Sequence, residues 1–277
     1  MPRWTTGESV LARAARVLEA FEHDRRSMTV AEIARRTGLP SPTAHRLVAQ
    51  LLDVGFLERT DRHRVRVGLH LWEIAALGAR APDLREAAMP YLEDVHVATR
   101  QHTQLTVLEG GDVLVVEWLK AREALGGLLL QAGRRVPAHA VAAGAVLLAH
   151  ADGRLQEEIL AGPLARFSDR TPTDPHELRT LWAHARRQGY VVCDGFVDPR
   201  ALSIAVPVCG PDGAPVAAIG VVVPVGDAEP MAFVPVLLAA ARGIGRALHA
   251  PAPPRSTRMR ALTHRGSAKF LIDRSER

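Results

Sequence analysis

The sequence has few cysteines and aromatic residues, and it has no long hydrophobic run. Only Cys193 and Cys209 occur in 277 residues, which excludes a disulfide framework and a zinc site built on closely paired cysteines. No apolar stretch reaches the roughly 20 residues that span a bilayer. Residues 1–9 lack the apolar core of a secretory signal. We therefore expect a soluble, cytoplasmic protein with no membrane segment.

The charge of the chain is unevenly distributed. Residues 1–80 carry 13 Lys/Arg and 9 Asp/Glu, residues 81–250 carry 15 and 19, and residues 251–277 carry 7 and 2. The two ends are therefore basic and the middle is acidic. Basic ends suit nucleic acid, because Lys and Arg displace counterions from phosphates, although a mild imbalance is also typical of ordinary solvated surface.

Three short helices are predicted in succession near the N-terminus. Apolar residues at helical spacing predict the first over residues 9–22. In the second, Thr29 and Glu32 form a capping-box pattern and Gly38 marks the C-terminal end. The third is predicted over residues 41–55. Short helices in this order are typical of a helix-turn-helix.

The third predicted helix has one face that packs and one that is free. Ser41 is its expected N-cap and Pro42 its first-turn proline. The apolar stripe consists of Ala44, Leu47, Val48 and Leu51. The residues that we expect to meet DNA are Ser41, Thr43, His45, Arg46 and Gln50. Arginine suits guanine acceptors and glutamine suits adenine, whereas His45 borders the apolar stripe and is equally suited to packing or to a phosphate.

A hairpin with a basic tip follows the third helix. Residues 56–59 and 64–67 are strand candidates around a polar turn. This pattern predicts a wing whose tip, formed by Arg62, His63 and Arg64, meets phosphates or a minor groove. The alternative is a charged tip that only keeps the protein soluble. Residues 69–81 then predict an apolar-rich helix that connects the domains.

The pattern changes to mixed helices and strands in the remainder of the chain. Helices are expected over residues 84–100, 140–150, 175–188 and 233–249, and strands over residues 104–109, 112–118, 128–130, 203–208 and 216–223. This order predicts an α+β domain with one antiparallel sheet flanked by helices. The proline-containing basic residues 251–277 have no periodicity and are expected to be disordered.

Several sequence blocks, in this order, resemble the IclR family of bacterial transcriptional regulators: SVLARAARVLEAF, VAEIARRTGLPSPTAHRLVAQLLDVGFLER, GRRVPAHAVAAGAVLLA, RTPTDPHEL, GYVVCD and SIAVPV. The resemblance runs from Ser9 to about Ala250. It implies an α+β protein with a winged helix-turn-helix in residues 1–68, a linker helix in 69–82 and a GAF-like effector-binding and oligomerisation domain in 83–250, before the basic tail. It also implies a homodimer or a dimer of dimers.

The resemblance further implies an effector site in the C-terminal domain. The candidates carried over by position are Gly126, Gly127, His139, Gly144, Asp194, Arg200 and Ser203. Three alternatives stay open: a structural histidine at 139, a turn cap at 194 and an exposed loop arginine at 200. Val141 and Ala145 stand where the family usually has a threonine and a lysine, so we expect an effector with less negative charge than the family's small acids.

These patterns predict a sequence-specific DNA-binding regulator whose affinity for double-stranded operator DNA is controlled by a small organic effector. No catalytic, metal or cofactor site is predicted. Cys193 has no Cys/His/acid spacing around it, and the 12 histidines form no i, i+4 ligand pair with an acid. Two alternatives stay open, a regulator whose ligand-free sensor domain serves only oligomerisation and a small-molecule enzyme with an appended winged helix.

Overall fold

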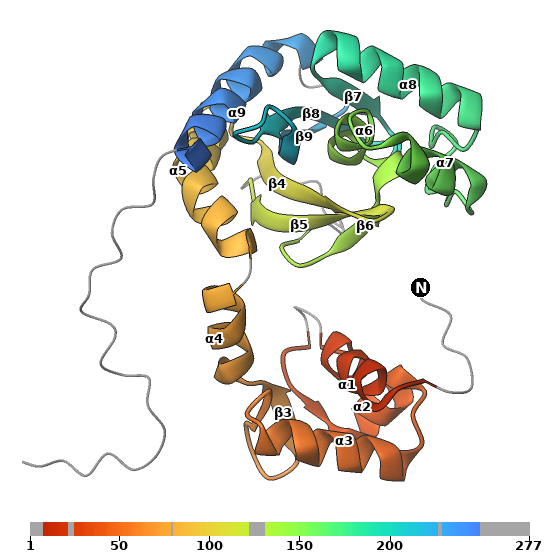
Figure 1. Cartoon of the computed structure of the whole chain (residues 1–277), viewed down its shortest axis with the longest axis vertical. Helices are drawn as coiled ribbons and strands as arrows, with labels where there is room; N and C mark the ends of the chain where they lie inside the picture. Colours follow the sequence, from red (N-terminus) through yellow and green to blue (C-terminus); the bar gives the residue numbers. More distant parts are fainter. Residues whose placement is uncertain (1–7, 22–24, 79, 122–130, 227–228, 250–277) are drawn as a thin grey trace, which may run out of the picture. The chain divides into compact units, whose positions relative to one another are not determined.

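The computed structural model describes residues 8–21, 25–78, 80–121, 131–226 and 229–249. The chain divides into two compact units, Met1–Glu86 and Ala87–Arg277. The N-terminal unit is drawn in red and orange in Figure 1, and most of the C-terminal unit in yellow to blue. Each unit has a hydrophobic core of its own.

The N-terminal unit is a winged helix-turn-helix. Its elements are α1 (Val10–Glu19), β1 (Met28–Thr29), α2 (Val30–Thr37), α3 (Ser41–Asp53), β2 (Leu57–Arg59), β3 (Arg64–Val67) and α4 (Leu69–Gly78). The strands form a small antiparallel sheet in the order β1-β3-β2, in which β1 was not foreseen from the sequence. Residues from all three first helices and from both wing strands share the core, so the wing and α3 are held on one scaffold.

The helix ends of this unit follow the predicted local signals, with one exception. The Thr29 side chain accepts a hydrogen bond from the Glu32 backbone, and the Glu32 carboxylate accepts one from the Thr29 backbone. Gly38 ends α2 in the left-handed region with φ of 67°. The exception is Ser41, which is the first residue of α3 and makes no capping bond. The N-cap is Pro40, so the predicted capping role of Ser41 is wrong.

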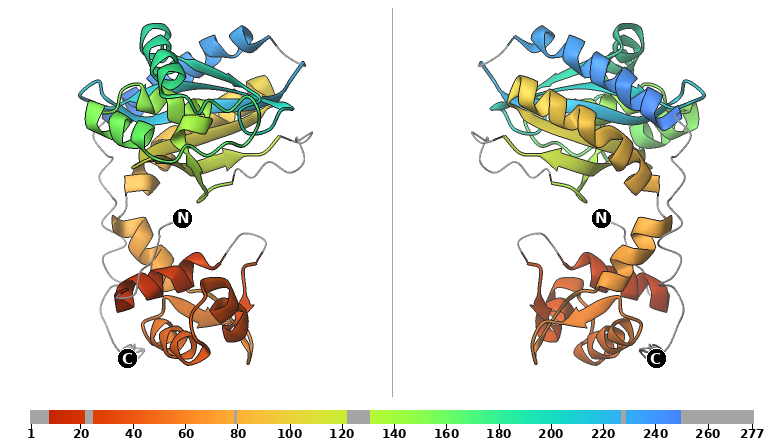
Figure 2. Two further views of the ribbon diagram at one scale, coloured as in Figure 1. Left: turned by 90° about the vertical axis from the view of Figure 1, so that its right-hand side faces the viewer. Right: turned by 90° about the vertical axis from the view of Figure 1, so that its left-hand side faces the viewer.

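The C-terminal unit is an α+β sandwich around one sheet. It contains α5 (Arg80–Thr99, which begins before the unit boundary), β4 (His102–Glu109), β5 (Asp112–Leu119), β6 (Arg135–Pro137), η1 (Ala138–Ala140), α6 (Ala142–Leu148), α7 (Gly153–Ala161), α8 (Pro175–Gln188), β7 (Val191–Asp194), β8 (Ala201–Cys209), β9 (Pro215–Pro224), η2 (Pro230–Ala232) and α9 (Val234–His249). The six strands are antiparallel, in the order β6-β5-β4-β9-β8-β7. Figure 2 shows α5 and α9 side by side on one face of this sheet.

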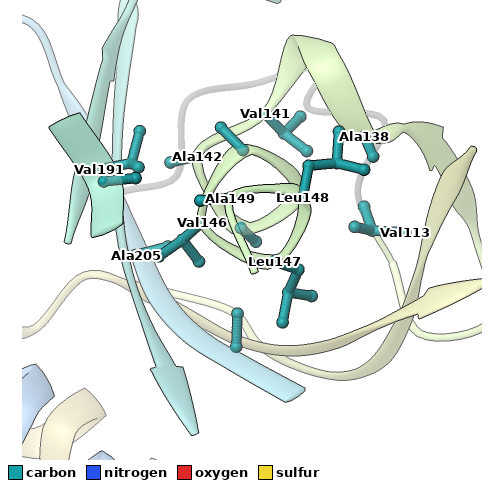
Figure 3. Packing of buried hydrophobic residues seen from close by; sticks show 14 of the residues in the cluster. Val113, Ala138, Val141, Ala142, Val146, Leu147, Leu148, Ala149, Val191 and Ala205 are labelled. Atoms are coloured by element: carbon teal, nitrogen blue, oxygen red, sulfur yellow. The ribbon is translucent and has the colours of Figure 1, made fainter. Parts of the chain in front are cut away.

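Close packing on both faces of the sheet depends on glycine. On the α6 side, a Cβ on Gly144 would lie 2.1 Å from the Ala138 carbonyl oxygen. On the other side, a Cβ on Gly243 of α9 would lie 2.2 Å from the ring of Tyr91 on α5. Figure 3 shows α6 end-on, with Val146 near the strand that carries Ala205. The residues of α6 are all buried, so this helix is the centre of the core on its side of the sheet.

Most elements lie close to their predicted positions. The helix expected over residues 140–150 is the shorter α6, which follows η1, and β4 begins two residues before the expected strand, whereas β6, α7 and β7 were not predicted. The expected strand at residues 128–130 and the tail at 251–277 lie outside the described residues. Residues 230–249 are apolar enough to cross a membrane by length and composition, but α9 packs on β8 and β9 as a core helix does.

Candidate nucleic-acid interface and effector site

Helix α3 presents the expected free face. Its apolar stripe is buried against α1 and α2. His45, Arg46 and Gln50 are exposed, Ser41 is exposed at the first turn, and Thr43 is half-buried. The buried stripe explains the orientation, because residues three and four apart share one side of a helix. The predicted exposure of Arg46 is confirmed.

The wing tip is organised by Asp61. Its Oδ1 atom accepts hydrogen bonds from the backbone N–H groups of His63 and Arg64, each at 2.8 Å. These two bonds favour the carboxylate and lower the pKa of Asp61. Arg62 and His63 are exposed at the turn. The tip therefore presents an ordered basic surface.

Arg64 has a role that the sequence did not indicate. Its Nη2 atom donates to the Ser27 carbonyl oxygen at 2.6 Å, and its Nε atom donates to Ser27 Oγ at 3.2 Å. Glu32 Oε2 lies 3.5 Å from Nη2. We expected this side chain to be exposed at the wing tip, but it is half-buried, with 39% of it accessible. Arg64 joins the wing to β1 and α2.

Two exposed arginines next to the turn before α3 were missed. Arg35 and Arg36 occupy the last turn of α2, and only Thr37 separates them from Gly38. The signal that could have identified them is their position beside the predicted turn, at a helix C-terminus where basic residues favour the helix dipole.

The effector candidates around α6 have structural roles. His139 is buried, and its Nε2 atom lies 2.9 Å from the Ala165 carbonyl oxygen. Gly144 allows α6 to approach the carbonyl group of Ala138. Val141 and Ala145 belong to the same core. The alternative of a structural histidine is therefore favoured for residue 139.

The two charged effector candidates are already paired with neighbours. Arg170 Nη1 lies 2.7 Å from Asp194 Oδ2. Arg200 donates from Nε and Nη2 to the two carboxylate oxygens of Asp198, at 3.0 and 2.7 Å. This forked pair lowers the pKa of Asp198 and leaves the guanidinium fork engaged. The ion pair with Asp198 favours the alternative of an exposed loop arginine for Arg200.

One loop contacts two of the predicted effector residues. Within residues 165–171, Ala165 contacts His139 and Arg170 contacts Asp194. Ser203 lies on β8 opposite Cys193 of β7. Gly126 and Gly127 lie outside the described residues.

A buried polar strand was missed by the sequence reasoning. His102, Gln104 and Thr106 alternate on β4 and are all buried. Thr106 is opposite Ala218, which belongs to the α6 core, so all three side chains face α6. The available signal was a run of polar residues, His102, Thr103, Gln104 and Thr106, in a strand followed by apolar residues. The predicted strand began at Gln104 and excluded His102.

His102 is held in one orientation. The Ala121 backbone N–H donates to its Nδ1 atom at 3.2 Å, and its ring stacks on Trp118 with centroids 4.9 Å apart. Burial lowers the pKa of His102, and the positive charges of Lys120 and His96 lower it further. Among the residues that the structure describes, its Nε2 atom is buried and has no hydrogen-bond partner.

A separate apolar groove of about 560 Å³ is lined by α8, β7 and η2. None of the predicted effector residues lines it. No group of three or more His, Cys, Asp or Glu residues placed to hold a metal ion is found in the described ranges. Cys193 is buried, which raises its thiol pKa far above the ordinary value and disfavours the reactive thiolate.

Comparison with known proteins identifies both units. Residues 10–61 match the IclR helix-turn-helix domain, and residues 78–246 match the bacterial transcriptional regulator IclR C-terminal domain. A crystal structure of an IclR homolog from Microbacterium hydrocarbonoxydans, complexed with 4-hydroxybenzoate, is 44% identical with a TM-score of 0.82 and covers 88% of this chain and 100% of that one.

Two curated relatives are also similar to this chain. The Pca regulon regulatory protein of Pseudomonas putida is 30% identical over 84% of this chain and 82% of its own length. The p-hydroxybenzoate hydroxylase transcriptional activator of Acinetobacter baylyi is 28% identical over 76% of this chain and 79% of its own length. Both relatives are named as regulators.

Proposed function

Because this chain belongs to the IclR family of bacterial transcriptional regulators, we propose that a hydroxylated aromatic acid bound in its C-terminal unit controls the affinity of its α3 and wing for an operator. Membership of this family establishes that the chain is a DNA-binding transcriptional regulator. The effector class, the contact residues and the oligomer are our proposals. The observation that carries the effector class is the bound 4-hydroxybenzoate in a homolog with 44% identity.

The free face of α3 supports base readout in a major groove. Arg46 and Gln50 are exposed on the side away from the buried stripe, and Thr43 lies beside them at half exposure. Arginine and glutamine form two-point hydrogen bonds with guanine and adenine, respectively. The wing residues Arg62 and His63 contact the phosphate backbone in this proposal, since Asp61 orders the turn that carries them through the backbone N–H groups of His63 and Arg64.

A monoanionic aromatic effector agrees with the composition of the α6 region. Val141 and Ala145 are buried core residues at the positions where the resemblance led us to expect a hydroxyl and a cation. A small dicarboxylate would lack the charged partner that a buried anion requires. An aromatic ring with one carboxylate buries more apolar surface than a small dicarboxylate does, and it carries less negative charge.

Exposed apolar side chains support assembly through the N-terminal unit. Leu11 on α1 is 81% exposed, and Leu69 and Trp72 on α4 are each 68% exposed. Large apolar side chains concentrated on short helices are typical of surfaces that pair in an oligomer. We propose a homodimer, with each copy reading one half-site. Sedimentation of wild type and a Trp72→Ala variant tests this, and an unchanged dimer population in the variant argues against a role for α4.

Control by the effector requires that it bind one arrangement of the dimer better than another. Selection of bound sequences from random DNA, with and without 4-hydroxybenzoate, tests the whole proposal. We expect one enriched palindromic sequence whose binding changes when the compound is added. Enrichment of no sequence contradicts the DNA-contact proposal, and an enriched sequence indifferent to every aromatic acid contradicts the effector class.

A further inference from the structure

One row of residues crosses four strands of the C-terminal sheet on the face that carries α6. The strand registers align His102 of β4 with Val222 of β9, Val222 with Ser203 of β8, and Ser203 with Cys193 of β7. Cys193 is part of the α6 core, which identifies the face. We call these four residues the sheet row. In this row, Val222 lies between two polar side chains, His102 of β4 and Ser203 of β8.

The tautomer of His102 follows from its hydrogen bond. Nδ1 accepts from the Ala121 N–H, so Nδ1 carries no proton. The neutral ring must then carry its proton on Nε2. That N–H group is buried and unpaired among the described residues. A buried donor without an acceptor is costly, and a bound ligand that supplies the acceptor removes that cost.

The surroundings of His102 fix the direction of this donor. Trp118 stacks against the ring with an interplanar angle of 26°. Gln104, opposite Trp118 in the strand register, places a second buried polar side chain on the same face. A donor fixed by stacking and by a backbone hydrogen bond loses little freedom when it binds an acceptor.

The local charge favours an anionic acceptor. Lys120 and His96 lie close enough to lower the pKa of His102, and no acidic group contributes to that shift. His102 consequently favours its neutral form, and Lys120 is the nearby cation that lowers its pKa besides burial. A hydrogen bond from such a donor to a carboxylate is charge-assisted and stronger than one to a neutral oxygen.

We propose that His102 Nε2–H donates to a carboxylate oxygen of the effector, that Gln104 supplies a second polar contact, and that Val222 packs against the effector's ring. This inference rests on the proposed effector class. His102 and Ser203 are separated by two strand spacings, roughly 10 Å, which suits a ring compound with polar groups at opposite ends. His102 is then the residue that selects aromatic acids over the corresponding phenols.

Isothermal titration of the full chain with 4-hydroxybenzoate and with phenol tests the proposal. His102→Asn keeps an acceptor for the Ala121 N–H and removes the donor at the Nε2 position. We expect affinity for 4-hydroxybenzoate to fall about tenfold or more. The smaller affinity for phenol, which has no carboxylate, should not change. His102→Gln restores an amide N–H near the Nε2 position and should recover part of the loss.

Thr106→Val is the matched control, because Thr106 lies on the same strand and face but outside the sheet row. The Thr106→Val variant should bind 4-hydroxybenzoate with the affinity of the wild type. Thermal unfolding of every variant separates lost binding from lost fold. If His102→Asn does not fold, Gln104→Met provides the test. We expect this variant to bind 4-hydroxybenzoate about threefold or more weakly than the wild type does.

The outcomes distinguish this inference from the proposed function. Wild type that binds 4-hydroxybenzoate, with a folded His102→Asn variant that binds it equally well, overturns the role of His102 and leaves the effector class standing. Equal losses for the acid and for phenol overturn the carboxylate contact. Wild type that binds neither 4-hydroxybenzoate nor any other hydroxylated aromatic acid overturns both the effector class and this inference.

Discussion

Replacing Arg46 and Arg64 separately with alanine should disrupt the DNA-binding unit in two different ways. Arg46 is exposed on α3, and the structure records no hydrogen bond or ion pair for it within the described part of the chain. Its loss should leave the melting temperature unchanged. If it pairs two acceptors of a guanine, Arg46→Ala should cost roughly 1–3 kcal/mol on operator DNA and almost nothing on random DNA.

Arg64→Ala should instead destabilise the unit. It removes hydrogen bonds of 2.6 and 3.2 Å to Ser27 and an ion pair to Glu32. Hydrogen bonds from a charged donor contribute about 1.5–3 kcal/mol when buried. The side chain is 39% exposed, which reduces this contribution, and the ion pair adds little at the surface. We expect a loss of about 1–2 kcal/mol in the free energy of unfolding.

Chemical denaturation gives the stability of each variant, and gel-shift titration on operator and random DNA at several salt concentrations gives the binding. Arg62→Ala is the control for a phosphate contact. It should keep the melting temperature and reduce the salt slope by about one contact. If Arg46→Ala weakens operator and random DNA equally, Arg46 holds a phosphate and base readout belongs to Thr43 and Gln50. If the Arg64→Ala variant has the same unfolding curve as the wild type, the contacts of Arg64 to Ser27 contribute nothing to stability, and the structural role assigned to Arg64 is wrong.

Three further predictions concern the C-terminal unit and the tail. Gly144→Ala should destabilise the protein by about 1–3 kcal/mol because its Cβ would overlap a carbonyl group, whereas Gly153→Ala, with open space around it, should not; equal unfolding curves would contradict this. Deleting residues 251–277, which carry 7 Lys/Arg and 2 Asp/Glu, should preserve fold and operator choice and make DNA binding less salt-dependent; a truncated chain that no longer folds or dimerises would show a structural tail. In thermal-shift measurements, aromatic monoacids should stabilise the protein more than short dicarboxylates because of Val141 and Ala145, and stabilisation by dicarboxylates alone would reject this.

Local signals in the sequence were sufficient for much of the fold. The capping box of Thr29 and Glu32, the end of α2 at Gly38, and the start of α8 after Asp174 were predicted and confirmed. In each case the interacting groups lie within a few residues of one another, so the chain needs no distant contact to form them. The buried stripe of α3 was also predictable, because helical periodicity alone defines which residues share a face.

The sequence also contained short-range features that the predictions did not use. Asp198 precedes Arg200 by two residues, and a pair at that spacing in a turn can close on itself, as it does here. Carrying Arg200 over by position placed it in an effector site and overlooked its neighbour. The same applies to His102, which was left outside the predicted strand although the polar residues of β4 begin with it.

Tertiary structure alone decided the roles of Arg64 and His102. Arg64 binds Ser27, which is 37 positions away, because β1 and β3 pair across the wing. His102 has its proton on Nε2 because a backbone N–H 19 positions away occupies Nδ1. The sheet order β6-β5-β4-β9-β8-β7 then places His102 two strands from Ser203. Periodicity indicates which face of a helix or strand a residue occupies. The partner that it meets on that face depends on how distant strands pair, and burial of the hydrophobic core determines that pairing.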